Sequence, residues 1–295
     1  MGNGDVFIGV DFGGTTISAG AVSEGEILGL STVPTMRERT PEDILGRIVE
    51  LIAEVTRNRS VSGIGIGVPC PAGPGTDRLG MIENIPSMEG YSFRPLVEER
   101  CEVPAVLEND ANCMAFGEHR AGALRGCSHC VCLTLGTGLG CGIIISGKLY
   151  RGAGNYAGEI WNITLRNGRI LEDEVSIGGL RTMYRDMAGV EIDPREMYDR
   201  FRDGDSTAAA VFDRFGEALG QIAVMLISTL DPERIALGGG LSLAYDAFKD
   251  GMLRTVEKTW GSEGGCRIVP AELSGRAAVI GAAALAEEYI GRRER

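Results

Sequence analysis

The fold is decided by residues 6–16, which read Val6-Phe7-Ile8-Gly9-Val10-Asp11-Phe12-Gly13-Gly14-Thr15-Thr16. The apolar run at the start of this stretch predicts a short buried strand, and residues 17–22 predict a second strand directly after the turn. Two strands joined by a Gly-Gly turn form a β-hairpin. The order of strand, glycine turn and strand returns at residues 130–145, with Gly136-Thr137-Gly138-Leu139-Gly140 as its turn. We interpret this recurrence as a coarse internal duplication, which predicts two related lobes.

Strands and helices alternate along the rest of the chain. Apolar positions at helical spacing predict a helix over residues 41–57, with Thr40 placed to cap it. Apolar runs at residues 64–69 and 105–108 predict buried strands. The same criteria predict helices at residues 93–100, 111–119, 183–187, 194–202 and 207–229, and a strand that ends in a glycine turn at residues 235–240. This alternation is typical of an α/β layer structure.

These patterns predict two domains with mixed sheets. We expect a small N-terminal α/β domain at residues 1–114 and a large α/β domain at residues 115–275. An Ala-rich closing helix at residues 276–295 is expected to pack back on the first domain.

The composition excludes several classes of protein. The formal net charge of -12 argues against a nucleic-acid-binding surface, because phosphate binding needs a concentrated basic face. Plain solubility is the simpler explanation of the acidic balance. The chain has no apolar run of about 18 residues and no secretory signal, and its eight cysteines are scattered through apolar runs. We therefore expect a cytoplasmic protein with reduced thiols and no membrane contact. The cluster at residues 127–132 lacks a second ligand pair and is not expected to bind metal.

Three glycine turns each follow a short apolar strand. They contain Gly13-Gly14, Gly136-Thr137-Gly138 and Gly238-Gly239-Gly240. Successive backbone N–H groups in such turns can bind anions, and the neighbouring Thr hydroxyls can add donors to phosphate oxygens. Tight hairpins also need glycine for purely structural reasons, so a single turn decides little.

A phosphate site here would need no lysine. The chain has no G-x-x-x-x-G-K-[ST] motif and only three Lys, at positions 148, 249 and 258. A Walker-type loop and the protein-kinase motif set are therefore excluded. Backbone amides, hydroxyls and a metal ion would have to hold any nucleotide.

Two aspartates stand at strand ends. Asp11 precedes the first glycine turn, where a carboxylate suits Mg²⁺ held next to phosphates, although it could also stabilise the turn. Asp110 lies between Asn109 and Asn112, in the run Glu108-Asn109-Asp110-Ala111-Asn112. Phosphoryl transfer to a hydroxyl needs a carboxylate that accepts the proton, and amides suit a polyol. An Asx-rich helix N-terminus explains the same residues equally well.

The ordered combination of these segments resembles the ROK family of sugar kinases, within the actin-like superfamily of two-lobed ATPases. The similar segments are Asp11 to Thr15, Gly63 to Pro71 (with Cys70 in place of the usual glycine), Asn84 to Gly90, Glu108 to Asn112, Leu135 to Gly140, Ala157-Gly158-Glu159 and Leu237 to Gly240. They run in the family's order along nearly the whole chain.

The resemblance implies a two-lobed, actin-like (ribonuclease H-like) α/β fold with an interlobe cleft. It implies that Asp110 is the general base, that Asn84, Asn109 and Glu159 bind the sugar, and that Asp11 holds Mg²⁺ through water. The residues implied to bind ATP are Asp11, Gly13, Gly14, Thr15, Thr16, Gly136, Thr137, Gly138, Gly238, Gly239 and Gly240. It also implies a homodimer, and lobe closure that excludes water from the reaction.

The chain departs from the family pattern after Glu159. Asn162 stands where the family's zinc-ligating His would be, and residues 163–171 contain no Cys. A structural zinc needs such ligands, so no zinc is expected. Glu172 is aligned with an acidic residue that contacts sugar in relatives, and Asn162 and Trp161 would alter the wall of the sugar pocket. Hydrogen bonds and packing could equally replace the metal as support for this loop.

The expected activity is transfer of the γ-phosphate of ATP to a hexose hydroxyl, most simply O6. A sugar sensor of the same family with little turnover is the alternative. A repressor would need a DNA-binding domain of about 60–80 residues ahead of the first strand, and only residues 1–5 precede it here. The sequence does not name the sugar, because a few hydroxyl contacts decide between epimers.

Overall fold

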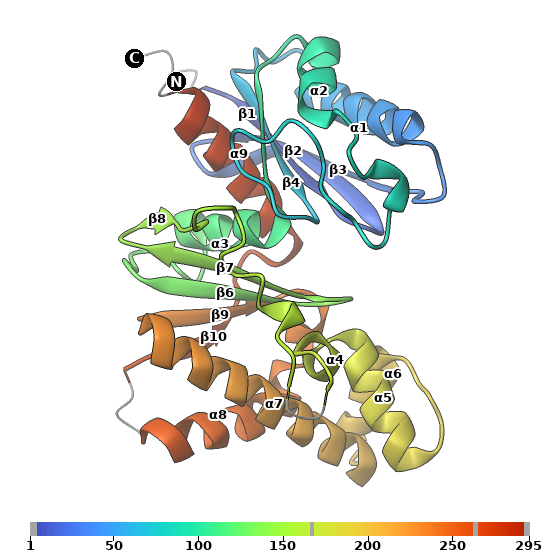
Figure 1. The fold of residues 1–295 in the computed structure, drawn as a ribbon, viewed down its shortest axis with the longest axis vertical. Helices are drawn as coiled ribbons and strands as arrows, with labels where there is room; N and C mark the ends of the chain where they lie inside the picture. Colours follow the sequence, from blue (N-terminus) through green and yellow to red (C-terminus); the bar gives the residue numbers. More distant parts are fainter. Residues whose placement is uncertain (1–4, 166–167, 262–264, 292–295) are drawn as a thin grey trace.

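The computed structural model describes residues 5–165, 168–261 and 265–291. Two five-stranded mixed sheets form its two lobes, which Figure 1 shows one above the other. The first sheet has the strand order β3-β2-β1-β4-β5 and the second has the order β10-β9-β6-β7-β8. The strands are β1 (Phe7–Phe12), β2 (Thr16–Ser23), β3 (Glu26–Pro34), β4 (Gly63–Val68), β5 (Ala105–Asn109), β6 (Cys130–Leu135), β7 (Leu139–Ile145), β8 (Lys148–Leu149), β9 (Arg234–Gly238) and β10 (Arg267–Pro270).

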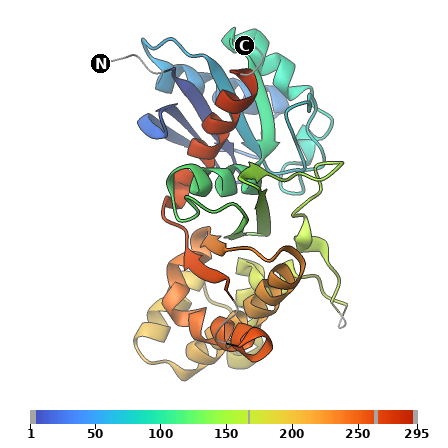
Figure 2. The ribbon, with the colours of Figure 1, turned by 90° about the vertical axis from the view of Figure 1, so that its left-hand side faces the viewer.

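Helices cover both faces of each sheet (Figures 1 and 2), with α3 on the inner face of the second. They are α1 (Pro41–Thr56), α2 (Phe93–Cys101), α3 (Asp110–Ala121), α4 (Glu172–Val175), α5 (Ile177–Ala188), α6 (Pro194–Arg202), α7 (Ser206–Leu230), α8 (Tyr245–Trp260) and α9 (Ala277–Ile290). The predicted cap of α1 is confirmed, because Thr40 Oγ1 accepts the N–H of Asp43 at 3.2 Å. The α/β prediction is confirmed as well.

The two sheets repeat one topology. In the first sheet β1 and β2 are antiparallel, and β4 and β5 run parallel to β1. In the second sheet β6 and β7 are antiparallel, and β9 and β10 run parallel to β6. The hairpin at residues 130–145 is therefore the structural counterpart of the N-terminal hairpin, and the predicted duplication is confirmed.

Helices α3 and α9 join the two lobes. Helix α3 follows β5, α9 follows β10, and the two helices pack on each other between the sheets. Their backbones come very close, since a Cβ at Gly281 would collide with the carbonyl oxygen of Cys113. Helix α9 also lies directly on β4, where a Cβ at Gly65 would collide with the carbonyl oxygen of Ala282. Much of the unusual glycine content thus permits close packing of helix on sheet and helix on helix.

The closing helix does pack on the first sheet, against β1, β2, β4 and β5. The predicted domain boundary after residue 114 falls inside α3, and its position stays a prediction. Among the elements that lacked a prediction are α8, which packs along α7, β10, which pairs with β9, and the short elements α4 and β8. Along the described ranges, no helix is both long and apolar enough to cross a bilayer.

Candidate active site

The first glycine turn is held in place from the end of β3. The Gly13 N–H donates to the carbonyl of Thr16 at 3.0 Å, which closes the turn. The fully buried Thr35 donates its hydroxyl to the carbonyl of Gly13 at 2.7 Å, and its N–H donates to the carbonyl of Thr15 at 2.9 Å. Thr15 and Thr16 are exposed. The turn is therefore rigid and leaves two hydroxyl-bearing side chains at the surface.

Asp110 is the first residue of α3, directly after the buried strand β5. Asn109 is the N-cap of this helix, since its Oδ1 accepts the N–H of Asn112 at 3.1 Å. The helix-cap interpretation therefore holds for Asn109. The carboxylate of Asp110 accepts the N–H of Ala111 at 2.7 Å, and the backbone N–H of Asp110 itself also hydrogen-bonds to it.

The structure brings three carboxylates together. Burial raises the pKa of Asp110 to about 7, and the negative charges of Asp11 and Glu159 contribute to this rise. Burial also raises the pKa of Asp11 to about 6. Asp11 lies on β1 at the level of Gly67 in β4. Carboxylates gathered in a dehydrated place hold protons more tightly, because each charged form is disfavoured by burial and by its neighbours.

The candidate metal residue fits a cation. No described residue forms an ion pair with Asp11, although burial disfavours its charge. An oxygen ligand of this kind suits Mg²⁺, which is held by few carboxylates and keeps several waters. Among residues 5–165, 168–261 and 265–291, no group of three or more His, Cys, Asp or Glu side chains has the arrangement of a metal site. The fit therefore rests on Asp11 together with the phosphates of a nucleotide.

Behind Asp110 lies a buried ion pair that the sequence did not indicate. Glu108 is 2% exposed and accepts hydrogen bonds from Arg151 Nε at 2.6 Å, Asn112 Nδ2 at 2.9 Å and the Asn109 N–H at 3.1 Å. The guanidinium of Arg151 also lies over the ring of Tyr289, 5.2 Å from its centroid. Arg151 follows β8 of the second lobe, so this pair links the second lobe to the strand that carries Asn109.

Two predicted sugar-binding residues lie close to residues of the site. Asn84 is exposed beside the first glycine turn, where a Cβ at Gly14 would meet the Cβ of Asn84 at 3.3 Å. Glu159 is half-buried and acts on Asp110 electrostatically. Its Oε2 accepts a hydrogen bond from Trp161 Nε1 at 2.6 Å. Asn162 is exposed, and no contact links its side chain to these groups.

The second and third glycine turns are neighbours. Gly239 has a φ of +82°, and a Cβ there would collide with the backbone of Leu135, the residue that precedes Gly136. Glu172 supports the second turn, because its Oε2 accepts the N–H of Leu139 at 2.9 Å. The carboxylate of Glu172 thus lies at the glycine turn of the second lobe, and a contact of Glu172 with sugar stays a prediction.

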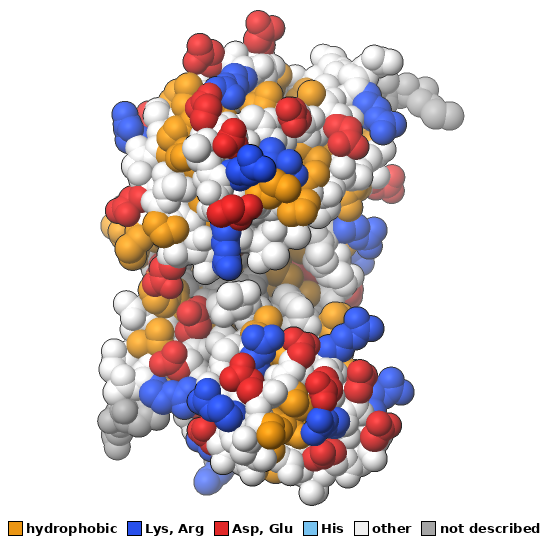
Figure 3. Space-filling view, turned by 90° about the vertical axis from the view of Figure 1, so that its right-hand side faces the viewer, with side chains coloured by type: hydrophobic (Ala, Val, Ile, Leu, Met, Phe, Trp, Pro, Cys, Tyr) orange, Lys and Arg blue, Asp and Glu red, His pale blue; other side chains and the backbone are white. Residues whose placement is uncertain are grey.

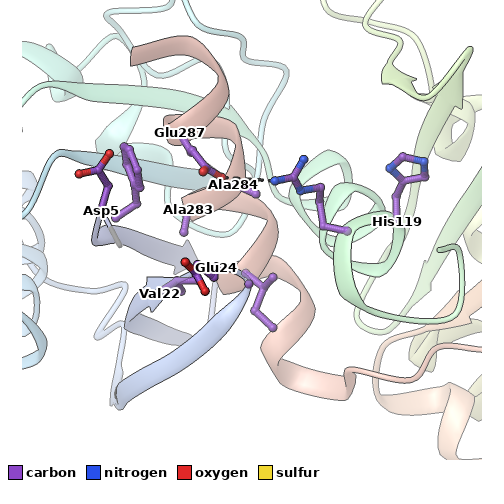
Figure 4. Close-up of a pocket in the computed structure, with 11 residues that line it drawn as sticks. Asp5, Val22, Glu24, His119, Ala283, Ala284 and Glu287 are labelled. Atoms are coloured by element: carbon purple, nitrogen blue, oxygen red, sulfur yellow. Dashed lines mark hydrogen bonds and ion pairs between the residues drawn. The ribbon is translucent and has the colours of Figure 1, made fainter. Parts of the chain in front are cut away.

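The face of the molecule in Figure 3 is hollowed between the two lobes. A separate pocket of about 260 Å³ lies elsewhere, between the start of β1, the end of α3 and α9 (Figure 4). Arg120 pairs with Glu287 at 3.3 Å in this pocket, and Asp5 and Glu24 also line it. No predicted site residue lines it.

The ROK family model matches residues 7–289. The chain belongs to the ROK family. The glucokinase of Thermotoga maritima is 32% identical over 96% of this chain and 98% of its own length. The N-acetyl-D-glucosamine kinase of Vibrio cholerae is 29% identical over 95% of this chain and 99% of its own length.

A solved ROK glucokinase from Streptomyces griseus, in complex with glucose and AMPPNP, is similar in structure. Its TM-score is 0.83 at 30% identity, over 96% of this chain and 99% of that chain. The two sheets and their helices thus have the actin-like ATPase fold of ROK sugar kinases, as the sequence predicted.

Two supporting residues escaped the sequence analysis, and the contact that a third one makes was not predicted. Thr35 is 22 residues from its partner Gly13, and Arg151 is 43 residues from Glu108. Local patterns carry no signal for such distant pairs. Trp161 stood out only as a departure from the family pattern, and its bond to Glu159 required coordinates.

Proposed function

We propose that this protein, a carbohydrate kinase of the ROK family, transfers the γ-phosphate of ATP to O6 of a hexose, with Asp110 as the general base. Asp110 accepts the proton of the O6 hydroxyl while that oxygen bonds to the γ-phosphorus. The bond between the γ-phosphorus and the bridging oxygen breaks, and ADP leaves. ATP is the expected donor, because the Streptomyces griseus relative binds an ATP analogue.

The environment of Asp110 carries this proposal. A general base works best when its pKa lies near the operating pH, because it is then both ionised and able to hold the proton. Burial and the neighbouring charges of Asp11 and Glu159 raise the pKa of Asp110 to about 7. Its position at the first turn of α3 adds a fixed orientation, since the neighbouring Asn109 caps that helix.

The remaining groups divide between nucleotide and sugar. The glycine turns at residues 13–14, 136–138 and 238–240 are proposed to bind the phosphates and the adenosine side of ATP through their backbone N–H groups. Asp11 would hold Mg²⁺ through water, and the ion would neutralise phosphate charge. Asn84, Asn109, Asn162, Glu159 and Glu172 are the proposed contacts to the sugar. The homodimer and the cytoplasmic location stay predictions.

The proposal is tested with MgATP and a panel of hexoses and hexosamines, in an assay coupled to ADP release. Glucose and N-acetylglucosamine come first, because the relatives are kinases of these sugars. We expect turnover with at least one sugar, and a 6-deoxy analogue of that sugar should be inert. Binding without turnover for every sugar would favour the sensor alternative and overturn the kinase proposal. Phosphorylation of the 6-deoxy analogue would overturn the choice of O6.

A further inference from the structure

The carboxylate of Glu159 is oriented by one neighbouring side chain. Trp161 lies two residues further on, within a short 3₁₀ turn at Ile160–Asn162, and its indole N–H donates to Glu159 Oε2 at 2.6 Å. Across the described ranges of the chain, this indole is the one donor to Glu159, and no cation pairs with it. The other oxygen, Oε1, has no partner from the described residues.

The indole is itself anchored. Its ring packs against the hydrophobic core of the second lobe, as do the side chains of Ile160 and Leu165. The following loop returns to this place, since the N–H of Leu171 donates to the carbonyl of Ile163 at 3.0 Å. Apolar packing therefore fixes the indole, and the indole fixes Glu159.

We propose that Trp161 is a specificity-determining positioning residue, which holds Oε2 of Glu159 so that Oε1 accepts a hydrogen bond from one hydroxyl of the bound sugar. This inference rests on the proposed function, because it takes Glu159 to face the sugar. An ionised carboxylate can only accept hydrogen bonds, so the ligand must present a donor at this position. A sugar without that donor leaves a half-buried carboxylate oxygen unpaired and is rejected.

The chain offers a matched control. It has two tryptophans, and the other is Trp260, which is 44% exposed at the end of α8. The Trp161→Phe variant keeps an aromatic ring that packs on the core and removes the N–H. The Trp260→Phe variant makes the same chemical change far from Glu159.

The first experiment measures binding of glucose and of N-acetylglucosamine by calorimetry without nucleotide, together with kcat and KM in the coupled assay. For W161F we expect the Kd and KM for sugar to rise about tenfold, as for a lost hydrogen bond to a charged group, with kcat within about threefold of the parent. W260F should match the parent in all three quantities. A Kd for W161F within twofold of the parent would overturn the inference.

The second experiment needs no change at Trp161. In W260F, Trp161 is the sole tryptophan, so its fluorescence reports on the indole beside Glu159. We expect the sugar to change this emission and to protect it from acrylamide quenching, with a midpoint at the calorimetric Kd. Emission that does not change on addition of a sugar shown to bind by calorimetry would count against the inference. Failure of the parent to bind any sugar of the hexose and hexosamine panel would remove the kinase proposal itself, which is a separate outcome.

Discussion

Replacing Arg151 should leave the buried carboxyl group of Glu108 without its cationic partner, and the resulting loss of folding stability should depend on pH. The two side chains form an ion pair at 2.6 Å, with Arg151 14% exposed and Glu108 2% exposed. Burial raises the pKa of Glu108, while Arg151 and Asn112 act to lower it. In the Arg151→Met variant, burial still raises the pKa of Glu108, but the charge of Arg151 no longer lowers it. The carboxyl group should then take up a proton on folding.

The loss of folding stability in R151M has an upper limit, which is the free energy of protonating Glu108. At pH 7 the unfolded carboxyl, with a pKa of about 4.3, lies about 2.7 pH units above its midpoint, so protonating it costs about 3.7 kcal/mol. Breaking a buried pair typically destabilises by about 3–5 kcal/mol, so R151M should approach this limit. The reverse variant, Glu108→Gln, should destabilise less, about 1–2 kcal/mol, because Arg151 keeps its contact with the Tyr289 ring.

The sign of the pH dependence follows from proton counting. In R151M the folded state binds a proton at Glu108 that the unfolded state has already lost at neutral pH. Stability from this group is therefore present at low pH and is lost as pH rises above the unfolded pKa. At pH 5.5 the protonation penalty should shrink to about 1.6 kcal/mol. The double variant E108Q/R151M has no buried charge and should recover about 2 kcal/mol relative to the two single changes added together.

Urea unfolding of the parent, both single variants and the double variant, at pH 7 and pH 5.5, measures these quantities. Arg254→Met is the matched control, because Arg254 pairs with Asp213 at 2.7 Å with both side chains largely exposed. Its urea midpoint should stay near that of the parent at both pH values. Two results would refute the assignment of a buried charged pair. One is that the stability losses of the two single variants add up to that of the double variant. The other is that R151M loses the same stability at both pH values.

Three further outcomes are expected. Asp110→Asn should lower kcat by about 10²–10⁴-fold while sugar binding by calorimetry is retained, and an unchanged kcat would remove Asp110 from the base role. Because the base must be ionised and burial raises the pKa of Asp110 to about 7, kcat/KM should fall about tenfold per pH unit below neutrality; a flat profile from pH 5.5 to 8 would contradict this. Gly281→Val should destabilise by about 3 kcal/mol or more, because its Cβ would collide with the Cys113 carbonyl. Gly275→Ala meets open space, so its melting temperature should stay near that of the parent.

The secondary structure was predictable where its signal is local. The helix predicted at residues 194–202 is α6 with the same limits, and the strand at residues 130–135 is β6. Helix α8 was missed although Phe248, Met252 and Val256 are spaced four residues apart and buried. The internal duplication also indicated α8, because a helix between β4 and β5 implies one between their counterparts β9 and β10.

The contacts that orient the site were not predictable in the same way. The run from Glu108 to Asn112 located Asp110, but periodicity cannot show that Glu108 of this run pairs with Arg151 or that Trp161 holds Glu159. Such contacts depend on where two separate segments meet after folding. A family pattern indicates which residues recur, and a residue that departs from the pattern acquires meaning only from its neighbours in space.

The duplication also shows that Asp11, which precedes the first glycine turn, has no acidic counterpart before the second turn. By hairpin register, Phe12 pairs with Ile17 as Leu135 pairs with Leu139, so Asp11 in β1 corresponds to Thr134 in β6. Both copies therefore place a glycine turn at the same point of the sheet, and both turns can offer backbone N–H groups to phosphate. The repeat supplies two similar turns, and at this register position of the strand only the first copy has an acidic residue.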